Sequence, residues 1–530
     1  QLDLKSSNKI GVLKFGNNTG KDSMDIVGKM AADWIIHGIT QKNLAQVVSP
    51  QIVEDYTNII KASLSSEEKA NVLQDYFKPA QIISGNYYLS NGNLIFQCSI
   101  IDGKLDKTLI ALEPVKCDST NPLDCIEELK QRILGYLITV NNNKSTGLQE
   151  TPPKYEAYEL FLEAKNASTY DENTIDLIEK AIAIDPEYFE PRTFQITYYY
   201  DQGKYKKADS LLKNISVNYK LDKRQENIVQ LYTALLEGNN RNVYRHLKRE
   251  YNIAPFELNT NASMLTVAVQ FINKPQIIDT IFRVIDTKDS DAESCFYCSN
   301  RIYVKALAEL ELKQYDSVLH YSMPVYKLEE QESFLNPMIV AYLNLNRDPM
   351  ELINTPGLRL SKEKRSKFLL YAGEQSLLVS NQDAADVYFD QVLGSDTLEV
   401  PHKIIGEAAY YKKDFKKAIA EFLKVKQQDS LNLDAISFLA NSYARLDQNK
   451  EAQQEIELLK SLRDDYQFGK IDYLMARYYA VLKDDTQALY YLNRAVAAGF
   501  LYTLYYYQHD PHFIPYLDTP EFNKVMTYWY

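Results

Sequence analysis

The chain has 530 residues, and its 71 acidic against 59 basic residues give a formal net charge of −12. This length is too great for one hydrophobic core and predicts several domains or a repeat array. The acidic balance argues against a nucleic-acid-binding surface. No apolar run approaches the length of a membrane span, so we expect nothing in this sequence to cross a membrane.

Residues 1–140 alternate β-branched apolar runs with amphipathic stretches, which predicts an α/β domain. Asn91-Gly92 between two of the apolar runs favours a β-hairpin. Pro122 suits the first position of a helix. The expected strands are 10–15, 45–48, 80–89, 94–101 and 109–115, and the expected helices are 24–39, 51–62 and 122–140.

The stretch FGNNTGKD (15–22) comes close to a phosphate-binding loop. Such a loop needs four residues between its glycines and a hydroxyl after its lysine. Here three residues separate Gly16 from Gly20, and Asp22 replaces the hydroxyl, where it would repel phosphate. We therefore interpret the stretch as a strand–turn–helix junction in which Asp22 or Ser23 caps the helix from Met24, and we expect no nucleotide cofactor.

The five cysteines do not decide whether the protein resides in an oxidising or a reducing compartment. Cys117 and Cys125 are close enough in sequence to bridge a loop onto a helix start, but the sequence does not decide whether they do. Cys295 and Cys298 form one C-x-x-C pair, and 509–512 carries two histidines. Neither supplies the four ligands of a zinc site, so we predict no metal.

Residues 141–154 are polar, end in prolines and read as a linker. Beyond them the phrase GKYKKADSLL (203–212), which carries a small residue between an aromatic and an apolar one, recurs with variations. The small residue stands at Ala385, Ala418, Ala452 and Ala488, at spacings of 33, 34 and 36. This is the period of a tetratricopeptide repeat, in which the small residue lets two antiparallel helices approach closely.

We therefore predict an all-α tetratricopeptide superhelix of about ten helical hairpins over 155–498, followed by a capping segment at 499–530. The consensus is strong for 188–222 and 366–498 and weaker for 223–365. In the poorer repeats the marker positions fall at Thr174, Tyr244, Ile278, Val318 and Glu351.

The stretches NNTG (17–20), MAADWIIHGI (30–39), VVSP (47–50) and IISGNYYLSNGNLIFQCSIID (82–102) resemble a TolB-amino-terminal-like α/β domain. Such domains precede tetratricopeptide arrays in bacterial membrane-anchored regulators, where a transmembrane helix connects them to a Ser/Thr kinase or a winged-helix transcriptional regulator. The closing HDPHFIPYLDTPEF (509–522) is similar to the same architecture. The resemblance implies the sensory region of a signalling protein on the periplasmic side of the inner membrane; a cytoplasmic location is the alternative.

Catalytic motifs are missing from the sequence: no kinase signature and no G-x-S-x-G elbow occurs. We expect no catalytic residue, no cofactor and no enzymatic activity in this chain, so that an attached effector would lie outside it.

In tetratricopeptide proteins, positions 15, 11, 8 and 7 before the small residue point into the concave groove. An asparagine such as Asn441 clamps a peptide backbone there, and Arg445 and Arg477 suit a carboxylate, although Ser437 stands where lysine is usual. The alternative is that these are solvated polar residues. The candidate ligand-binding residues are Lys403, Glu407, Tyr410, Asn441, Arg445, Tyr473 and Arg477.

The predicted function is the non-catalytic binding of a peptide or protein partner on the concave surface, as part of a membrane-anchored sensor. The alternative is a free-standing periplasmic or outer-membrane scaffold for protein assembly. The sequence leaves open the ligand, the effector and whether the chain forms a homodimer.

Overall fold

A computed structural model describes residues 9–42, 44–52, 77–103, 107–141, 153–166, 172–253, 255, 258–285, 296–327, 331–394 and 399–530. The chain divides into two compact units. Unit 1 comprises Gln1–Thr233, Arg245–Met264 and Arg283–Cys298. Unit 2 comprises Ala234–Tyr244, Leu265–Phe282 and Ser299–Tyr530. Most of the predicted linker at 141–154 and most of the expected helix at 51–62 lie outside the described residues.

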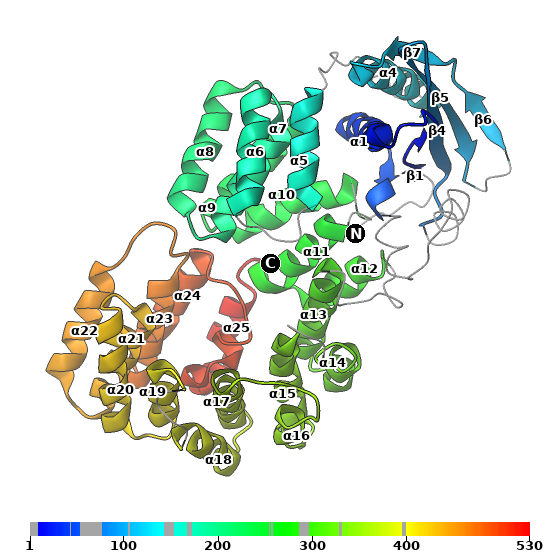
Figure 1. Ribbon diagram of the computed structural model, residues 1–530. Helices are drawn as coiled ribbons and strands as arrows, with labels where there is room; N and C mark the ends of the chain where they lie inside the picture. Colours follow the sequence, from blue (N-terminus) through cyan, green and yellow to red (C-terminus); the bar gives the residue numbers. More distant parts are fainter. Residues whose placement is uncertain are drawn as a thin grey trace. The chain divides into compact units, whose positions relative to one another are not determined.

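Unit 1 begins with a mixed β-sheet in the order β3-β1-β4-β5-β6 (Figure 1). β1 pairs with β3 and β4 in parallel, β4 with β5 antiparallel, and β5 with both β6 and β7 antiparallel, while β2 extends the parallel pairing along β4. The strands are β1 (Lys9–Val12), β2 (Gly16–Asn17), β3 (Gln46–Val48), β4 (Gln81–Ser90), β5 (Asn93–Asp102), β6 (Thr108–Ala111) and β7 (Val115–Asp118).

The turn between β4 and β5 confirms the predicted hairpin. Asn91 and Gly92 both have positive φ, 50° and 78°, and Ser90 pairs with Asn93. Two successive left-handed residues match the twist of the flanking strands, and Asn-Gly tolerates this conformation better than other residue pairs.

Two helices, α1 (Asp25–Gln41) and α4 (Pro122–Asn141), pack on each other and on the sheet, and Figure 1 shows both on one side of it. The chain approaches itself closely around Phe15, whose side chain is fully buried. A Cβ on Gly28 would lie 2.1 Å from the Phe15 carbonyl oxygen, and one on Gly85 would lie 2.3 Å from the Phe15 ring. Glycine is required at both positions because any side chain would push α1 or β4 away.

The stretch FGNNTGKD forms the predicted junction between a strand and a helix. Asn17 Oδ1 accepts a hydrogen bond of 3.0 Å from the Thr19 amide, and Gly20 takes a φ of 74°. The predicted cap is wrong: a 3-10 turn (Asp22–Met24) precedes α1, and the first helical residue is Asp25. The Met24 amide donates to the Lys21 carbonyl at 3.1 Å, so the backbone of this turn, and no side chain, satisfies that amide.

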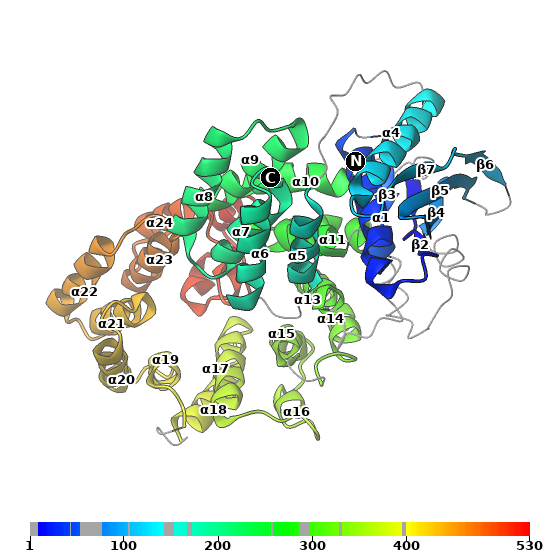
Figure 2. The same cartoon turned by 45° about the horizontal axis from the view of Figure 1, so that its top comes forward.

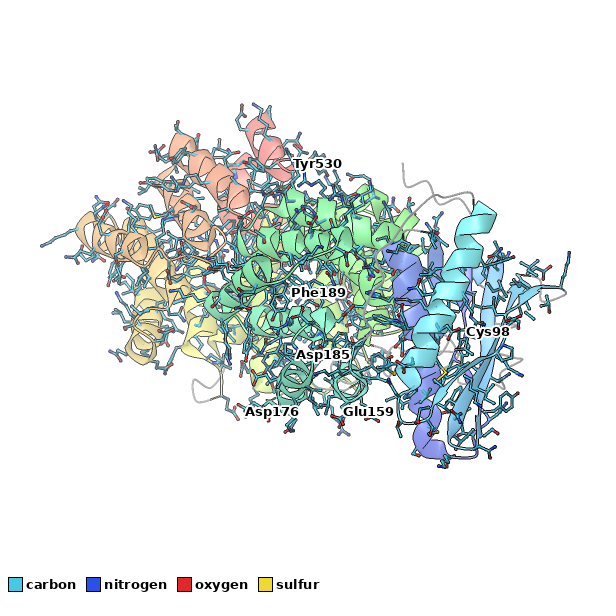
Figure 3. The ribbon with its side chains drawn as sticks, turned by 90° about the horizontal axis from the view of Figure 1, so that it is seen from above. Cys98, Glu159, Asp176, Asp185, Phe189 and Tyr530 are labelled. Atoms are coloured by element: carbon cyan, nitrogen blue, oxygen red, sulfur yellow. A yellow bond between two sulfur atoms is a disulfide. The ribbon has the colours of Figure 1, made fainter. Side chains whose placement is uncertain are left out.

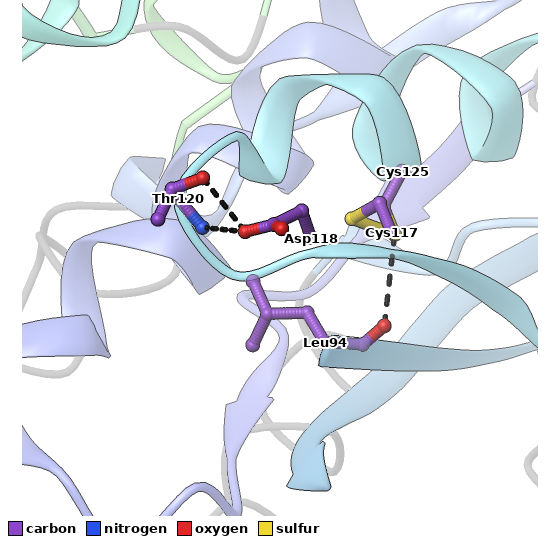
Figure 4. The surroundings of a disulfide bond; sticks show 5 residues. All are labelled: Leu94, Cys117, Asp118, Thr120 and Cys125. Atoms are coloured by element: carbon purple, nitrogen blue, oxygen red, sulfur yellow. Dashed lines mark hydrogen bonds between the residues drawn. A yellow bond between two sulfur atoms is a disulfide. The ribbon is translucent and has the colours of Figure 1, made fainter. Parts of the chain in front are cut away.

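A disulfide joins Cys117 on β7 to Cys125 at the start of α4, with a Cα–Cα distance of 5.5 Å (Figure 4). Cys125 Sγ lies 3.9 Å from the carbonyl oxygen of Leu94 on β5. The bond therefore holds the edge of the sheet against the helix that covers it. Cys298 is also disulfide-bonded, and Cys295 lies outside the described residues.

Cys98 on β5 is buried as a free thiol (Figure 3). Burial raises its pKa to about 12, so this thiol stays protonated and is a poor nucleophile.

The α/β region and the first helices of unit 1 share one hydrophobic core. Ala157 and Tyr158 of α5 belong to the same apolar cluster as Ile35 of α1. The Tyr158 hydroxyl also donates to Asp33 Oδ2 at 2.5 Å. The helices that follow the sheet are α5 (Tyr155–Asn166), α6 (Glu172–Ile184), α7 (Phe189–Asp201), α8 (Tyr205–Asn218), α9 (Lys223–Leu236), α10 (Asn240–Ile253) and α11 (Leu258–Thr266).

Asp185, which stands between the end of α6 and Pro186, has a structural role (Figure 3). Asp185 is buried and accepts a hydrogen bond of 2.8 Å from the amide of Lys154, which precedes α5. The carboxylate thereby joins the start of the first helix to the end of the second.

Unit 2 contains the regular part of the array. Four hairpins follow one another there: α17/α18, α19/α20, α21/α22 and α23/α24 (Figure 2). Ala385, Ala418, Ala452 and Ala488 each lie on the second helix of a hairpin with no exposed surface. The helices are α12 (Ile278–Phe282), α13 (Phe296–Glu311), α14 (Tyr315–Ser322), α15 (Leu335–Asn344), α16 (Met350–Ile353), α17 (Lys362–Leu378), α18 (Gln382–Leu393), α19 (His402–Tyr411), α20 (Phe415–Gln428), α21 (Leu433–Arg445), α22 (Asn449–Ser461), α23 (Lys470–Leu482), α24 (Asp485–Ala497) and α25 (Pro520–Met526).

The stretch with weaker consensus is less regular. α11 continues into a π-helical segment, Val267–Phe271, and α16 is only four residues long. The marker position Glu351 is exposed, so the close helix contact of the good repeats is missing there.

The predicted fold class is confirmed: a small α/β region with a mixed sheet precedes a long run of helices. Where the structure describes the chain, none of its helices combines the length and the apolar character that crossing a bilayer requires.

Candidate ligand-binding groove

The first helices of the four regular hairpins, α17, α19, α21 and α23, pack in succession and form one wall of a groove. The residue 11 positions before each buried alanine is Glu374, Glu407, Asn441 and Arg477 in turn. Equivalent positions on successive repeats face the same surface. At this position the side chain therefore changes from acidic on α17 and α19 to basic on α23.

A cavity of about 670 Å³ opens in this groove. We call it the groove cavity. Its charged lining residues include Glu374, Lys403, Glu407, Asp434, Lys470 and Arg477, and its aromatic ones include Phe368, Tyr371, Tyr411, Phe438, Tyr505 and Tyr506.

One side of the groove is filled by residues 505–513 of the chain itself, which we call the C-terminal insert. Asp510 of the insert is fully buried, and its Oδ2 accepts hydrogen bonds from Tyr473 Oη at 2.7 Å and from Arg477 Nε at 2.6 Å. Burial alone would raise the pKa of Asp510, but the Arg477 guanidinium and the neighbouring His512 hold it well below its usual range. This ion pair stays charged in the folded protein.

His512 of the insert lies against Tyr410 and Asn441, two of the residues predicted from the sequence to bind a peptide. Its ring stacks on Tyr410, with centroids 5.4 Å apart, and its Nε2 lies 3.2 Å from Tyr410 Oη and 3.4 Å from Asn441 Nδ2. Its Nδ1 lies 2.9 Å from Asp510 Oδ1. Burial lowers the pKa of His512, which fits a neutral ring that donates from Nδ1 to Asp510 and accepts at Nε2.

The structure divides the seven predicted residues into three groups. Tyr410, Asn441 and Tyr473 are buried under the C-terminal insert. Arg445 is exposed, and its charge partly offsets the effect of burial in raising the pKa of the Tyr410 hydroxyl. The residues that line the groove cavity are Lys403, Glu407 and Arg477.

The carboxylate expected for Arg477 is supplied by the chain's own Asp510. The prediction missed this because it treated the closing segment as a cap on the last helix, and nothing in local sequence indicates that the segment returns to the concave face.

The lysines of the groove cavity are paired. Asp434 Oδ2 lies 2.9 Å from Lys403 Nζ, and Asp434 Oδ1 lies 2.7 Å from Lys470 Nζ. Although burial would raise the pKa of Asp434, these two ammonium groups hold it well below its usual range. Burial would likewise lower the pKa of Lys403, but Glu407 and Asp434 raise it.

Two carboxylates of the groove cavity are not neutralised in this way. Glu374 makes no hydrogen bond or ion pair with any described residue, and Glu407 has one long contact, 3.9 Å to Lys403 Nζ. Burial is the main cause that raises the pKa of Glu374 well above its usual range, and the charges of Glu407 and Asp510 add to it. Burial also raises the pKa of Glu407 to about 7.

Sequence reasoning missed Glu374, although its signal was present. Glu374 stands 11 positions before Ala385, as Glu407 does before Ala418 and Arg477 before Ala488. Asp434 and Lys470, at the first turns of α21 and α23, carry no such signal because the repeat register does not point them into the groove.

Among the described residues, no group of three or more His, Cys, Asp or Glu side chains is placed to hold a metal ion. Both histidines of 509–512 contact carboxylates of the protein itself. His509 Nε2 lies 2.8 Å from Glu311 Oε1, and His512 bonds to Asp510.

No protein-family model and no curated protein matches the chain. Of 37 matching chains among solved structures, one is in the crystal structure of the APC/C hetero-tetramer Cut9-Hcn1, with 14% identity, a TM-score of 0.27, and coverage of 77% of this chain and 82% of that chain. The TPR domain of P58(IPK) has 15% identity and a TM-score of 0.18, covering 62% and 98%. The Naa15/Naa10 structure with bound HypK-THB has 12% identity and a TM-score of 0.17, covering 71% and 66%. TM-scores this low carry no argument about the function of this chain.

Proposed function

We propose that the chain is a non-catalytic binding region that takes an extended segment of a partner protein into the groove of α17, α19, α21 and α23. The observation that carries the proposal is the groove cavity, about 670 Å³ in volume and adjacent to a stretch of chain already held in the same groove. The C-terminal insert, which contains the 3-10 turn Tyr507–His509 and the start of a second one at Pro511, shows that the groove accommodates a segment of chain through side-chain hydrogen bonds and aromatic stacking.

The resemblance to membrane-anchored regulators supports a sensory role for this binding region. The order of an α/β region before the repeats agrees with that architecture, and the Cys117–Cys125 disulfide is consistent with an oxidising compartment such as the periplasm. In this proposal a partner that binds one arrangement of the repeats better than another shifts the population toward it. An effector outside this chain then responds to that shift.

A free-standing scaffold is the second candidate, and the same disulfide is compatible with it. Translating the DNA upstream of this sequence separates the two. An apolar segment of about 20 residues preceded by a kinase or winged-helix domain supports the sensor. A signal peptide in that place supports the scaffold.

Peptide display against the whole chain tests binding in the groove. The variant Glu374→Arg places a long cationic side chain inside the groove cavity and blocks it. Glu457→Arg makes the same change on the exposed surface of α22 and serves as the matched control. We expect the unmodified chain and Glu457→Arg to enrich the same peptides from a random library and Glu374→Arg to lose them. Enrichment by all three proteins, or by none, would contradict the proposal.

A further inference from the structure

The charges around the groove cavity do not balance locally. Each lysine and arginine of its lining has a carboxylate partner among the described residues. The pairs are Lys364 with Glu332, Lys367 with Glu363, Lys403 and Lys470 with Asp434, and Arg477 with Asp510. Where the structure describes the chain, Glu374 has no such partner, and the shortest contact of Glu407 with a cation is 3.9 Å, to Lys403 Nζ. Because Asp434 serves two lysines, the lining as a whole has six carboxylates against five lysine and arginine side chains, an excess of one negative charge.

The two remaining carboxylates occupy the same repeat position on consecutive first helices. Glu374 and Glu407 stand 11 residues before Ala385 and Ala418, and α17 packs directly against α19. Both therefore face the same stretch of the groove, where their charges repel each other. The charge of Glu407 adds to the effect of burial in raising the pKa of Glu374, while Arg477 and Lys403 oppose this rise without cancelling it. A cation between them would remove both the repulsion and the lack of a partner.

Aromatic rings form the rest of the wall at this place. Tyr371 donates its hydroxyl to the Leu504 carbonyl at 3.0 Å, and its ring meets the ring of Tyr505 edge to face at 5.3 Å. Tyr411 also lines the groove cavity. The negative faces of such rings attract ammonium and guanidinium groups, whereas they offer nothing to an anion.

We propose that the groove cavity binds one lysine or arginine side chain of the partner segment, with its cationic group held between Glu374 and Glu407 and against the rings of Tyr371 and Tyr411. This inference rests on the proposed function and specifies its ligand. The stem of such a side chain packs on the aromatic wall, and its head reaches the two carboxylates.

The first arm of the test compares peptide libraries enriched by the unmodified chain and by the Glu374→Gln/Glu407→Gln variant. Glutamine keeps the shape of the wall and removes its charge. We expect peptides enriched by the unmodified chain to share one lysine or arginine at a fixed position, and the variant to lose this preference. The Glu451→Gln/Glu457→Gln variant removes two carboxylates from the exposed surface of α22, outside the groove cavity, and it should keep the preference.

The second arm uses one enriched peptide made in two forms, with the shared lysine free or acetylated at Nζ; if the shared residue is arginine, citrulline replaces it. Acetylation keeps the stem and removes the charge. Titration calorimetry should show binding to the unmodified chain weakened by about 10-fold or more, as expected for a charge-assisted contact. The Glu374→Gln/Glu407→Gln variant should distinguish the two forms by less than about 3-fold.

The outcomes separate the inference from the proposed function. The unmodified chain could enrich peptides that Glu374→Arg does not bind and that share no lysine or arginine. This result would overturn the inference and still support peptide binding in the groove. No enrichment at all would overturn both. Tight binding of spermidine that displaces the enriched peptide at an equal or lower concentration would assign the pocket to small amines and overturn the assignment to a protein side chain.

Discussion

Arg477 and Asp510 form an ion pair that water hardly reaches, because the guanidinium side chain is 9% exposed and the carboxylate 0%. Two further groups of the C-terminal insert and α23 complete it: Tyr473 donates to the same carboxylate, and His512 bonds to its other oxygen. A buried pair contributes little if both partners are replaced by apolar groups, yet removing one partner leaves a buried charge without compensation.

Replacing Asp510 with asparagine should therefore lower the free energy of unfolding of unit 2 by about 3–5 kcal/mol. Urea denaturation followed by the fluorescence of Trp529, in a Trp34→Phe background, measures this change in unit 2 alone. Asp518→Asn, at an exposed position of the same closing stretch, should change it by no more than about 0.5 kcal/mol. Equal effects of the two substitutions would mean that the insert does not depend on this pair.

Folding raises the pKa of Glu374 and lowers that of Asp510, so the two carboxylates make the free energy of unfolding depend on pH in opposite directions. The pKa of Glu374 is higher in the folded protein than the ordinary value of 4.5, so the folded state keeps a proton that the unfolded state releases. Stability is therefore lost as the pH rises from 4.5 toward the folded pKa. Glutamine does not titrate and escapes this loss.

We expect Glu374→Gln to stabilise the protein by about 1 kcal/mol or more at pH 8, the cost of a buried group without a partner, and much less at pH 5. Thermal unfolding at the two pH values checks this. Glu363→Gln on the same helix removes a half-exposed carboxylate paired with Lys367 and should show no such pH-dependent gain. A stabilisation by Glu374→Gln that is equal at both pH values would contradict the assigned cause.

At the scale of the element, a helical hairpin closes because its two helices carry small residues where they meet. Ala418 of α20 is fully buried, and Gly406 of α19 lies so close to the same helix that an added Cβ would come within 3.0 Å of the Phe422 ring. Small residues on both helices thus let the hairpin close, while Phe422 fills the space beside them.

Ala418→Leu should lower the free energy of unfolding by about 1–3 kcal/mol, because the larger side chain forces the two helices apart. Ala420→Leu makes the same substitution two residues along α20 at an exposed position, and we expect a change of at most about 0.5 kcal/mol. Circular dichroism during thermal unfolding compares the two variants. Similar midpoints would show that close helix contact at the marker position is not what holds the hairpin.

At the scale of the whole molecule, unit 1 is more than an α/β region with repeats attached. The apolar cluster that contains Ile35 of α1 continues through Tyr158 of α5 to Ala181 of α6 and Tyr188. Arg224, at the start of α9, donates to Thr40 at the end of α1 at 3.0 Å. Cutting the chain between sheet and helices would expose this shared core on both sides.

We therefore expect the sheet and the first helices to unfold together. Ile178→Ala removes a fully buried side chain of α6 and should destabilise unit 1 by about 2–5 kcal/mol. In a Trp529→Phe background the unfolding transition is followed by the fluorescence of Trp34 on α1. The midpoint of this transition should fall, although the substituted residue lies on a different helix, α6. Lys180→Ala, exposed on the same helix, is the control. An unchanged Trp34 transition in Ile178→Ala would show that the α/β region unfolds independently.

Much of the groove could be predicted from residues that are near one another in sequence. The spacing of Ala385, Ala418, Ala452 and Ala488 predicts the hairpins, and the register before each alanine predicts which side chains face the concave surface. Lys403, Glu407 and Arg477 do line the groove cavity. Helical periodicity is a local property of the chain, and each further repeat shows the same spacing again. The periodicity and the repeat can therefore both be recognised in a single sequence.

The sequence by itself determined the α/β region, the Asn91-Gly92 turn and the regular hairpins, because each depends on backbone preferences and side-chain spacing over a few turns of chain. Only the tertiary structure decided that Asp510 satisfies Arg477, that Gln375 meets the His509 carbonyl 134 residues away, and that Glu374 is left without a partner. These are pairings between distant segments, chosen by which buried charges and hydrogen-bonding groups can be satisfied together, and no local pattern records that choice.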